Sequence, residues 1–460
     1  MTDAAPALRR SLQRRHMQMI ALGGVIGAGL FVGSGVVISS AGPAAVISFA
    51  LTGMLVVLVM RMLAEMAVAY PVIGGFYEYS RLALGELAGF LTGWMYWYFW
   101  VIVVALEAVA GAKLLGNWWP QVRPWEFTLG LTALFTLVNL LSVRSYGEAE
   151  FWFASIKVVA IVCFLVAGVV FAVHLWPGAA GGVAHLTRHG GFMPNGIVPV
   201  LTGAVAATGF YFGTEIVTVA AAESAEPEKA VASAMQSVIW RVLIFYVGSI
   251  FLIVSILPWN DAVRMERPYV SVLEVLRVPG AATIMGAIIL TAVLSALNSG
   301  LFASSRMLMA LAAHGDAPRL FARLDVRGVP VAAILAGTGF GYAAVVMSYV
   351  SPDRVFAFLV NSYGTVAIFV YVIIAVSELR LRRRLEREHP ERLRLRMWGF
   401  PYLTRFAVAV MLVIVAAMAW IPDQRAPLVF GVASVLIMLA AFGLRRAAAP
   451  RAVAQRTAAP

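Results

Sequence analysis

Charged residues are scarce in this chain. Asp, Glu, Lys and Arg make up 13% of its 460 residues, whereas an average soluble domain carries about 25%. Hydrophobic residues make up 61%, and the mean hydropathy is +0.87. Apolar runs of roughly 20 residues, each long enough to cross a bilayer, recur from Met17 to the stretch ending near Leu444. The composition therefore argues against a water-soluble protein and leaves little room for a soluble domain.

Cysteine and metal-binding patterns are also scarce. Cys163 is the only cysteine and lies inside an apolar run, so it can form no intramolecular disulfide. The six histidines show no convincing metal spacing; His185 and His189 are four apart, but in a glycine-rich connector. We find no nucleophile–base arrangement that would indicate an enzyme. We therefore expect no enzymatic activity, no bound metal and no cofactor.

The basic residues are placed as in a membrane protein. The formal net charge is +12, which could suggest a nucleic-acid partner, but the arginines cluster at the ends of apolar runs and in short connectors. The basic N-terminus precedes a glycine-broken apolar segment without a small-residue cleavage site, so we expect a retained first helix and no signal peptide. These patterns predict lipid as the surroundings and no nucleic acid as a partner.

Charged, proline-rich and glycine-rich connectors divide the chain into about twelve predicted spans. The basic segments, among them the run from Arg380 to Arg405, fall on one side, which is cytoplasmic by the positive-inside rule. An even number of crossings places both termini there, and the connectors 174–195 and 258–280 outside. The spans are 17–38, 44–70, 88–114, 125–142, 150–173, 196–222, 235–257, 281–313, 330–349, 353–378, 402–421 and 426–444.

Glycine is dense in the first and sixth spans, each of which opens a group of five. The glycines are Gly23, Gly24, Gly27, Gly29, Gly33 and Gly35 in the first, and Gly203, Gly209 and Gly213 in the sixth. Glycine destabilises a helix interior by roughly 1 kcal/mol relative to alanine. Interrupted helices at matching positions of two halves are typical of transporters with inverted repeats. Close packing of helices through small residues is the alternative explanation.

A helix break at bilayer depth is tolerable where its backbone lines a cavity or binds a ligand. The freed amides and the N-terminus of a half-helix attract an anion. In the first span this predicts a cradle for a substrate carboxylate, formed by Val25, Ile26, Gly27, Ala28 and Gly29.

Three ionisable residues lie deep within apolar spans: Glu107, Lys157 and Glu215. Each would cost roughly 2.5–3.5 kcal/mol at a lipid-facing helix centre, so we expect all three to face the interior. Either acid could attract a substrate amine or carry a proton, or could be a structural hydrogen-bonded acid. Lys157 could instead extend to water along its apolar stem. The aromatic run that includes Phe210 and Phe212 could line a pocket or belong to the core.

Motifs along the chain resemble the amino acid–polyamine–organocation superfamily, in particular the bacterial amino acid permeases and their γ-aminobutyrate (GABA) group. They are residues 24–34 (GVIGAGLFVGS), 61–69 (RMLAEMAVA), 148–152 (EAEFW), 215–224 (EIVTVAAAES) and 257–260 (LPWN). The similarity extends from about residue 8 to residue 445. The narrower likeness to GABA permeases rests on Leu106-Glu107-Ala108, the 215–224 run, residues 271–276, and residues 395–398 with Pro401.

This resemblance implies a leucine-transporter-like fold of two inverted five-helix repeats with helices 1 and 6 broken. The domains would be an N-terminal segment (1–16), a core (17–378, with repeats at about 17–173 and 196–378), a basic loop (379–401), two added helices (402–444) and a tail (445–460). It further implies import of a small amino acid by proton symport in the cell inner membrane. A permease for another amino acid, such as D-alanine, glycine, proline or an aromatic residue, is the alternative, followed by an amino-acid sensor or channel.

The resemblance also implies roles for individual residues. The first break and the turn of residues 212–215, which includes Gly213, would contact the substrate. Lys157 matches the fifth-helix lysine that replaces a sodium ion in proton-coupled relatives, and Ser295 and Ser299 would border it. Glu215 could share in proton coupling. Oligomeric state and stoichiometry are left open.

Overall fold

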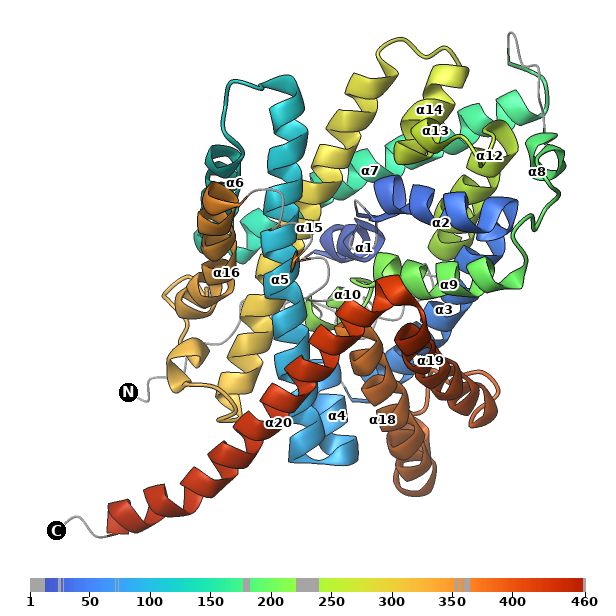
Figure 1. The fold of residues 1–460 in the computed structure, drawn as a ribbon. Coiled ribbons are helices and arrows are strands. Elements are labelled where there is room, and N and C mark those ends of the chain that lie inside the picture. The colour runs from blue at the N-terminus through green and yellow to red at the C-terminus, as the bar shows by residue number, and fades with distance from the viewer. Residues whose placement is uncertain are drawn as a thin grey trace.

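The structure is a computed structural model that describes residues 13–23, 26–27, 29–70, 72, 74–176, 183–220, 240–351, 355, 358–359 and 365–457. Every regular element in these residues is a helix, and the helices pack side by side around a shared interior (Figure 1). The expected all-helical architecture is therefore confirmed.

The first half of the chain forms helices of very different lengths. They are α1 (Arg14–Gly23), the π-helical turn η1 (Gly29–Gly33), α2 (Ser34–Ala41), η2 (Gly42–Ala44), α3 (Ala45–Ala69), α4 (Phe76–Leu84), α5 (Glu86–Trp118), α6 (Pro124–Leu141), α7 (Val143–Ala172) and the short α8 (His185–Arg188).

The second half repeats the alternation of short and long helices. Its described elements are α9 (Ile197–Ala207), η3 (Thr208–Tyr211), α10 (Ile216–Ala220), η5 (Val242–Gly248), α12 (Ser249–Ile256), α13 (Ala262–Glu266), α14 (Pro268–Val275), α15 (Ala281–Ala313), η6 (Arg319–Ala322), α16 (Val331–Val350), α18 (Val366–Glu388), η7 (Pro390–Arg392), α19 (Tyr402–Trp420) and α20 (Pro422–Thr457).

Helices α5 and α15 form the centre of the bundle and lie along one another (Figure 1). Each has 33 residues, or about 50 Å at 1.5 Å per residue, longer than the hydrocarbon core of roughly 30 Å. A Cβ at Gly300 of α15 would lie 2.8 Å from Val104 Cγ2 of α5. Glycine therefore lets the two backbones approach closely.

The predicted spans agree with the observed helices in position more closely than in number. Nine helices of the described residues are long and apolar enough to cross a membrane, so the count of twelve is not confirmed. Several boundaries also differ. Helix α7 begins at Val143, before the predicted start at residue 150, α18 continues to Glu388, and α20 continues to Thr457.

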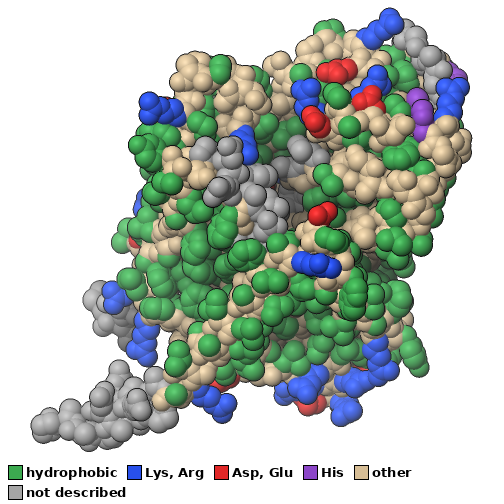
Figure 2. Space-filling model, viewed as in Figure 1, with side chains coloured by type: hydrophobic (Ala, Val, Ile, Leu, Met, Phe, Trp, Pro, Cys, Tyr) green, Lys and Arg blue, Asp and Glu red, His purple; other side chains and the backbone are tan. Residues whose placement is uncertain are grey.

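The surface agrees with a membrane environment. Hydrophobic side chains cover most of the middle of the face drawn in Figure 2, and most Lys and Arg side chains on that face lie toward its lower or upper edge. Exposed apolar residues such as Val159, Val166 and Leu412 belong to long helices. An apolar belt between charged edges is the pattern that a bilayer selects.

Candidate substrate and proton site

The first predicted span is broken where its glycines cluster. Helix α1 ends at Gly23, and helical structure resumes at Gly29 with η1. Between them, Ile26 and Gly27 are described and are not helical, although Leu30 N donates to Gly27 O at 3.2 Å. We call Ile26 and Gly27 the first break. Val25 and Ala28, also predicted to bind substrate, lie outside the described residues.

The sixth predicted span is broken as well. Helix α9 ends at Ala207, and η3 carries the chain to Tyr211. Phe212 is then extended, with φ −70° and ψ 143°, and Gly213 has φ 115°, a region that favours glycine. Helix α10 begins only at Ile216. We call residues 212–215 the second break.

The elements beside the two breaks are in contact through a ring and two glycines. A Cβ added at Gly29 would lie 2.7 Å from Phe210 Cδ1, and one added at Gly33 would lie 2.6 Å from Phe210 Cζ. No described heavy atom outside its immediate neighbours lies within 4 Å of a Cβ at Gly27. Gly29 and Gly33 thus allow close packing, as the alternative explanation of the glycines proposed, while open space lies beside Gly27.

Glu215 ends the second break and is buried. Its carboxylate accepts hydrogen bonds from the amide of Gly213, at 3.2 and 3.0 Å to the two oxygens, and from the hydroxyl of Tyr371 on α18 at 3.2 Å. These donors make the structural role of this acid visible. They also hold its carboxyl group at the second break. The contact of Glu215 with the substrate stays a prediction.

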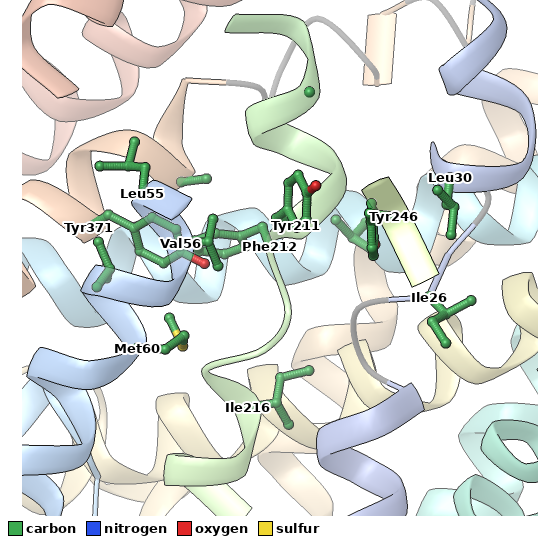
Figure 3. Close-up of a cluster of buried hydrophobic side chains, with 14 of the residues drawn as sticks. Ile26, Leu30, Leu55, Val56, Met60, Tyr211, Phe212, Ile216, Tyr246 and Tyr371 are labelled. Atoms are coloured by element: carbon green, nitrogen blue, oxygen red, sulfur yellow. The ribbon is translucent and has the colours of Figure 1, made fainter. Parts of the chain in front are cut away.

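Aromatic rings surround the second break. Phe212 lies with its ring centroid 4.2 Å from that of Phe99 on α5 and 5.0 Å from that of Tyr371. Tyr211 stacks on Tyr246, with their ring centroids 4.2 Å apart. Figure 3 shows Tyr211 with Tyr246 and Phe212 with Tyr371, together with Ile26 and Leu30 of the first predicted span. Tyr371, Tyr246 and Phe99 were not predicted as site residues from the sequence. A hydroxyl-bearing ring in an apolar span was the available signal for the two tyrosines.

Lys157 lies in a second polar cluster, on α7, and is fully buried. Its Nζ donates to Ser295 Oγ of α15 at 2.8 Å, and that hydroxyl donates to Glu150 Oε1 of α7 at 2.6 Å. The alternative in which Lys157 extends to water is therefore wrong. The expected contact with Ser295 is present, and Glu150 was not anticipated.

Glu107 belongs with this second cluster. It lies on α5, within electrostatic range of Lys157, as Glu150 does. Ser299 is buried one turn after Ser295 on α15, and the neighbouring Asn298 accepts a hydrogen bond from Asn139 of α6 at 3.1 Å. The structure thus separates the three deep ionisable residues into Glu215 at the second break and Glu107 with Lys157.

Arg61 and Glu65 lie four residues apart on α3 and have different partners. Glu65 is buried and bonds to Arg382 of α18 and to the amide of Met397. Arg61 donates to a backbone carbonyl and lies over the ring of Trp398, 4.9 Å from its centroid. Burial explains the difference, because a buried carboxylate needs several donors.

A bundle of apolar helices with two broken helices whose flanking turns touch defines a multi-pass membrane transporter. Residues 16–446 match the family described as amino acid permease. The chain belongs to the amino acid permease family.

Named relatives agree with this assignment, and one solved structure shares the fold. The chain is 49% identical to the gamma-aminobutyric acid permease of Bacillus subtilis (strain 168), over 100% of this chain and 97% of the relative. It is 45% identical to the gamma-aminobutyric acid permease of Escherichia coli (strain K12), over 90% and 89%. A manganese transporter of Eremococcus coleocola shares the fold, with a TM-score of 0.58 at 12% identity over 96% of this chain and 97% of that one.

Proposed function

We propose that this permease imports γ-aminobutyrate together with a proton by alternating access. The observation that carries the proposal is the pairing of two helix breaks across the Gly29–Phe210 contact in a chain 45–49% identical to two gamma-aminobutyric acid permeases. The names of those relatives indicate γ-aminobutyrate as the substrate to propose. The breaks supply backbone groups that a zwitterion can bind.

The substrate would lie with its carboxylate at the first break. Free amides attract an anion, and the open space beside Gly27 leaves room for one. The ammonium lies three methylenes away from the carboxylate and would approach Glu215, the buried acid of the second break. Glu107 is a weaker choice for this role because it faces Lys157.

Proton coupling would involve Lys157 with Ser295 and Ser299. Lys157→Met keeps most of the apolar stem and removes the charge. We expect this variant to lose accumulation under an inward proton gradient while keeping some substrate binding or exchange. Accumulation of γ-aminobutyrate at the wild-type level would contradict a coupling role for Lys157.

The substrate is tested in proteoliposomes with an imposed proton gradient. Labelled γ-aminobutyrate should accumulate, a protonophore should abolish the accumulation, and unlabelled γ-aminobutyrate should compete better than glycine, D-alanine, proline or aromatic amino acids. Stronger competition by one of these would identify a sister permease. Uptake that never exceeds equilibrium would indicate a channel, and binding without uptake a sensor.

We also propose that both termini lie in the cytoplasm and that the protein is in the cell inner membrane. The run of basic residues from Arg380 to Arg405 supports this orientation. In a Cys163→Ala background, a membrane-impermeant thiol reagent added to intact cells should label a cysteine in the 174–195 connector and should not label Arg387→Cys. Labelling of the latter would reverse the topology.

A further inference from the structure

Glu150 is a buried acid on α7, with no exposed surface, in a helix long and apolar enough to cross the membrane. An intramembrane carboxylate with a specific partner indicates a functional site. Its partner is the hydroxyl of Ser295, which donates to Glu150 Oε1 at 2.6 Å and accepts from Lys157 Nζ at 2.8 Å. The three groups therefore form one directed line of hydrogen bonds.

The helix geometry explains how this line forms. Glu150 and Lys157 are seven residues apart, which places them on one face of α7 about 10.5 Å apart along the axis. Side chains on a helix lean toward its N-terminus, so the long lysine reaches back toward Glu150. Ser295 enters from α15 and bridges the remaining gap.

The ionisable groups around Lys157 can together bind one additional proton. Lys157 faces Glu150 of its own helix and Glu107 of α5. From α6 and α15 the cluster gains amide and hydroxyl groups, Asn139–Asn298 and Ser299. With all three ionised, one cation faces two carboxylates, so the cluster reaches zero net charge when it binds one more proton. A buried site strongly favours that neutral state.

Arg15 and His16 of α1 contact a different acid of α7. Arg15 Nη2 lies 2.5 Å and His16 Nε2 lies 3.2 Å from Glu148 Oε1 of α7. Glu148 is two residues before Glu150 and is partly exposed, whereas Glu150 is fully buried. The two acids of the EAE motif therefore have different partners, and Glu150 belongs to the interior cluster.

We propose that Glu150 receives the coupling proton from Lys157 through Ser295. The ammonium of Lys157 gives one proton to Ser295 Oγ as the hydroxyl proton of Ser295 passes to Glu150 Oε1, which leaves a neutral amine, an intact serine and a neutral acid. The amine then takes a proton from water on one side, and the acid releases one to water on the other. This inference rests on the proposed proton symport and adds a second proton-binding residue to it.

The test compares Glu150→Gln with wild type in proteoliposomes. An inward gradient of about one pH unit can sustain roughly tenfold accumulation of a substrate that moves with one proton. We expect Glu150→Gln to keep γ-aminobutyrate counterflow in the absence of a gradient, and to lose both this accumulation and substrate-induced proton uptake, followed with a pH-sensitive dye inside the vesicles. Glu150→Asp, which keeps the carboxylate, should recover part of both.

A serine pair provides the matched control. Ser295→Ala removes the bridging hydroxyl and should slow proton uptake while sparing counterflow. Ser304→Ala removes a buried hydroxyl of the same helix that donates to Leu301 O at 3.2 Å, and should behave as wild type. If Glu150→Gln elutes as an aggregate, Ser295→Ala decides, and proton uptake at the wild-type rate in that variant overturns the inference.

The outcomes separate this inference from the proposed function. Wild-type γ-aminobutyrate uptake without proton movement would overturn symport itself, whatever the variants do. Wild-type coupling with equal, gradient-driven accumulation by Glu150→Gln would overturn the role of Glu150 alone.

Discussion

The contact of Gly29 with Phe210 leads to a prediction about stability. In Gly29→Ala the new Cβ would lie 2.7 Å from Phe210 Cδ1, 3.2 Å from Cγ and 3.4 Å from Cβ. Rotation of the ring about its Cβ–Cγ bond moves Cδ1 but leaves Cγ and Cβ in place, so the tight contact with Cγ remains. Phe210 or the backbone of η1 or η3 must therefore shift to accommodate the methyl group.

The expected magnitude follows from overpacking. Extra methyl groups in a well-packed interior destabilise by about 1–3 kcal/mol. Gly27→Ala should do the opposite or nothing, because the described residues leave the space beside Gly27 open and alanine lowers the entropy of the unfolded chain, by about 0.4–1 kcal/mol where the backbone permits it. The two methyl groups, added two residues apart, should therefore affect stability differently: the one at Gly29 destabilises, and the one at Gly27 is neutral or stabilising.

The assay is thermal unfolding in detergent, followed by loss of the monodisperse peak in size-exclusion chromatography. Gly29→Ala should unfold at a lower temperature than wild type, and Gly27→Ala at the same or a higher one. In a Phe210→Ala background, which lacks the clashing Cδ1 and Cγ atoms, Gly29→Ala should destabilise less than it does in wild type, as expected of a coupled pair in a double-mutant cycle. Equal unfolding temperatures for the two alanine variants would refute the packing argument.

Two other contacts give predictions of the same kind. Arg382→Met leaves the buried Glu65 without its cation and should destabilise by about 3–5 kcal/mol. Arg384→Met breaks an exposed pair two residues later on α18 and should leave stability nearly unchanged; thermal unfolding that ranks the two variants in the other order would contradict this. Tyr371→Phe removes the hydroxyl that donates a hydrogen bond to Glu215 at 3.2 Å. The loss should destabilise the protein by about 1.5–3 kcal/mol and alter substrate affinity in equilibrium binding. Unchanged stability and binding would show that this hydrogen bond is dispensable.

Features that depend on local composition could be predicted from the sequence. Apolar runs located the long helices, and clustered glycines located both breaks. Glycines such as Gly27 in the first span and Gly213 in the sixth lower the helix propensity of the segment that contains them. Lys157 was predictable as an interior group for a similar reason. A charge in the middle of an apolar run has few favourable places to go.

Glu150 was missed because a helix boundary was misplaced. The charges of Arg144 and Glu148 made the preceding stretch look like a connector, so the predicted span began at Glu150 itself. Helix α7 begins at Val143, and Glu148 is accommodated by its ion pair with Arg15. The partner of Glu148 lies on α1, outside the segment, so the composition of the segment could not reveal it.

The partners of buried polar groups were also beyond the sequence. Arg61 lies four residues from Glu65, but Glu65 bonds to Arg382, 317 residues away. Tyr371 and Glu215 are 156 residues apart. Spacing along a helix predicts which side chains can meet, but burial decides which of the possible donors a carboxylate takes.

The placement of α1 links the proposed substrate site to the proposed proton site. Helix α1 packs against α10, which follows the second break, and against α7 and α15, which hold Lys157 and Ser295. Its own C-terminal end leads into the first break. A substrate carboxylate bound at that break and a change of charge at Lys157 would therefore act on the same short helix from two sides. Coupling needs such a shared element, because a ligand shifts a conformational equilibrium only by the difference in its interactions with the two states.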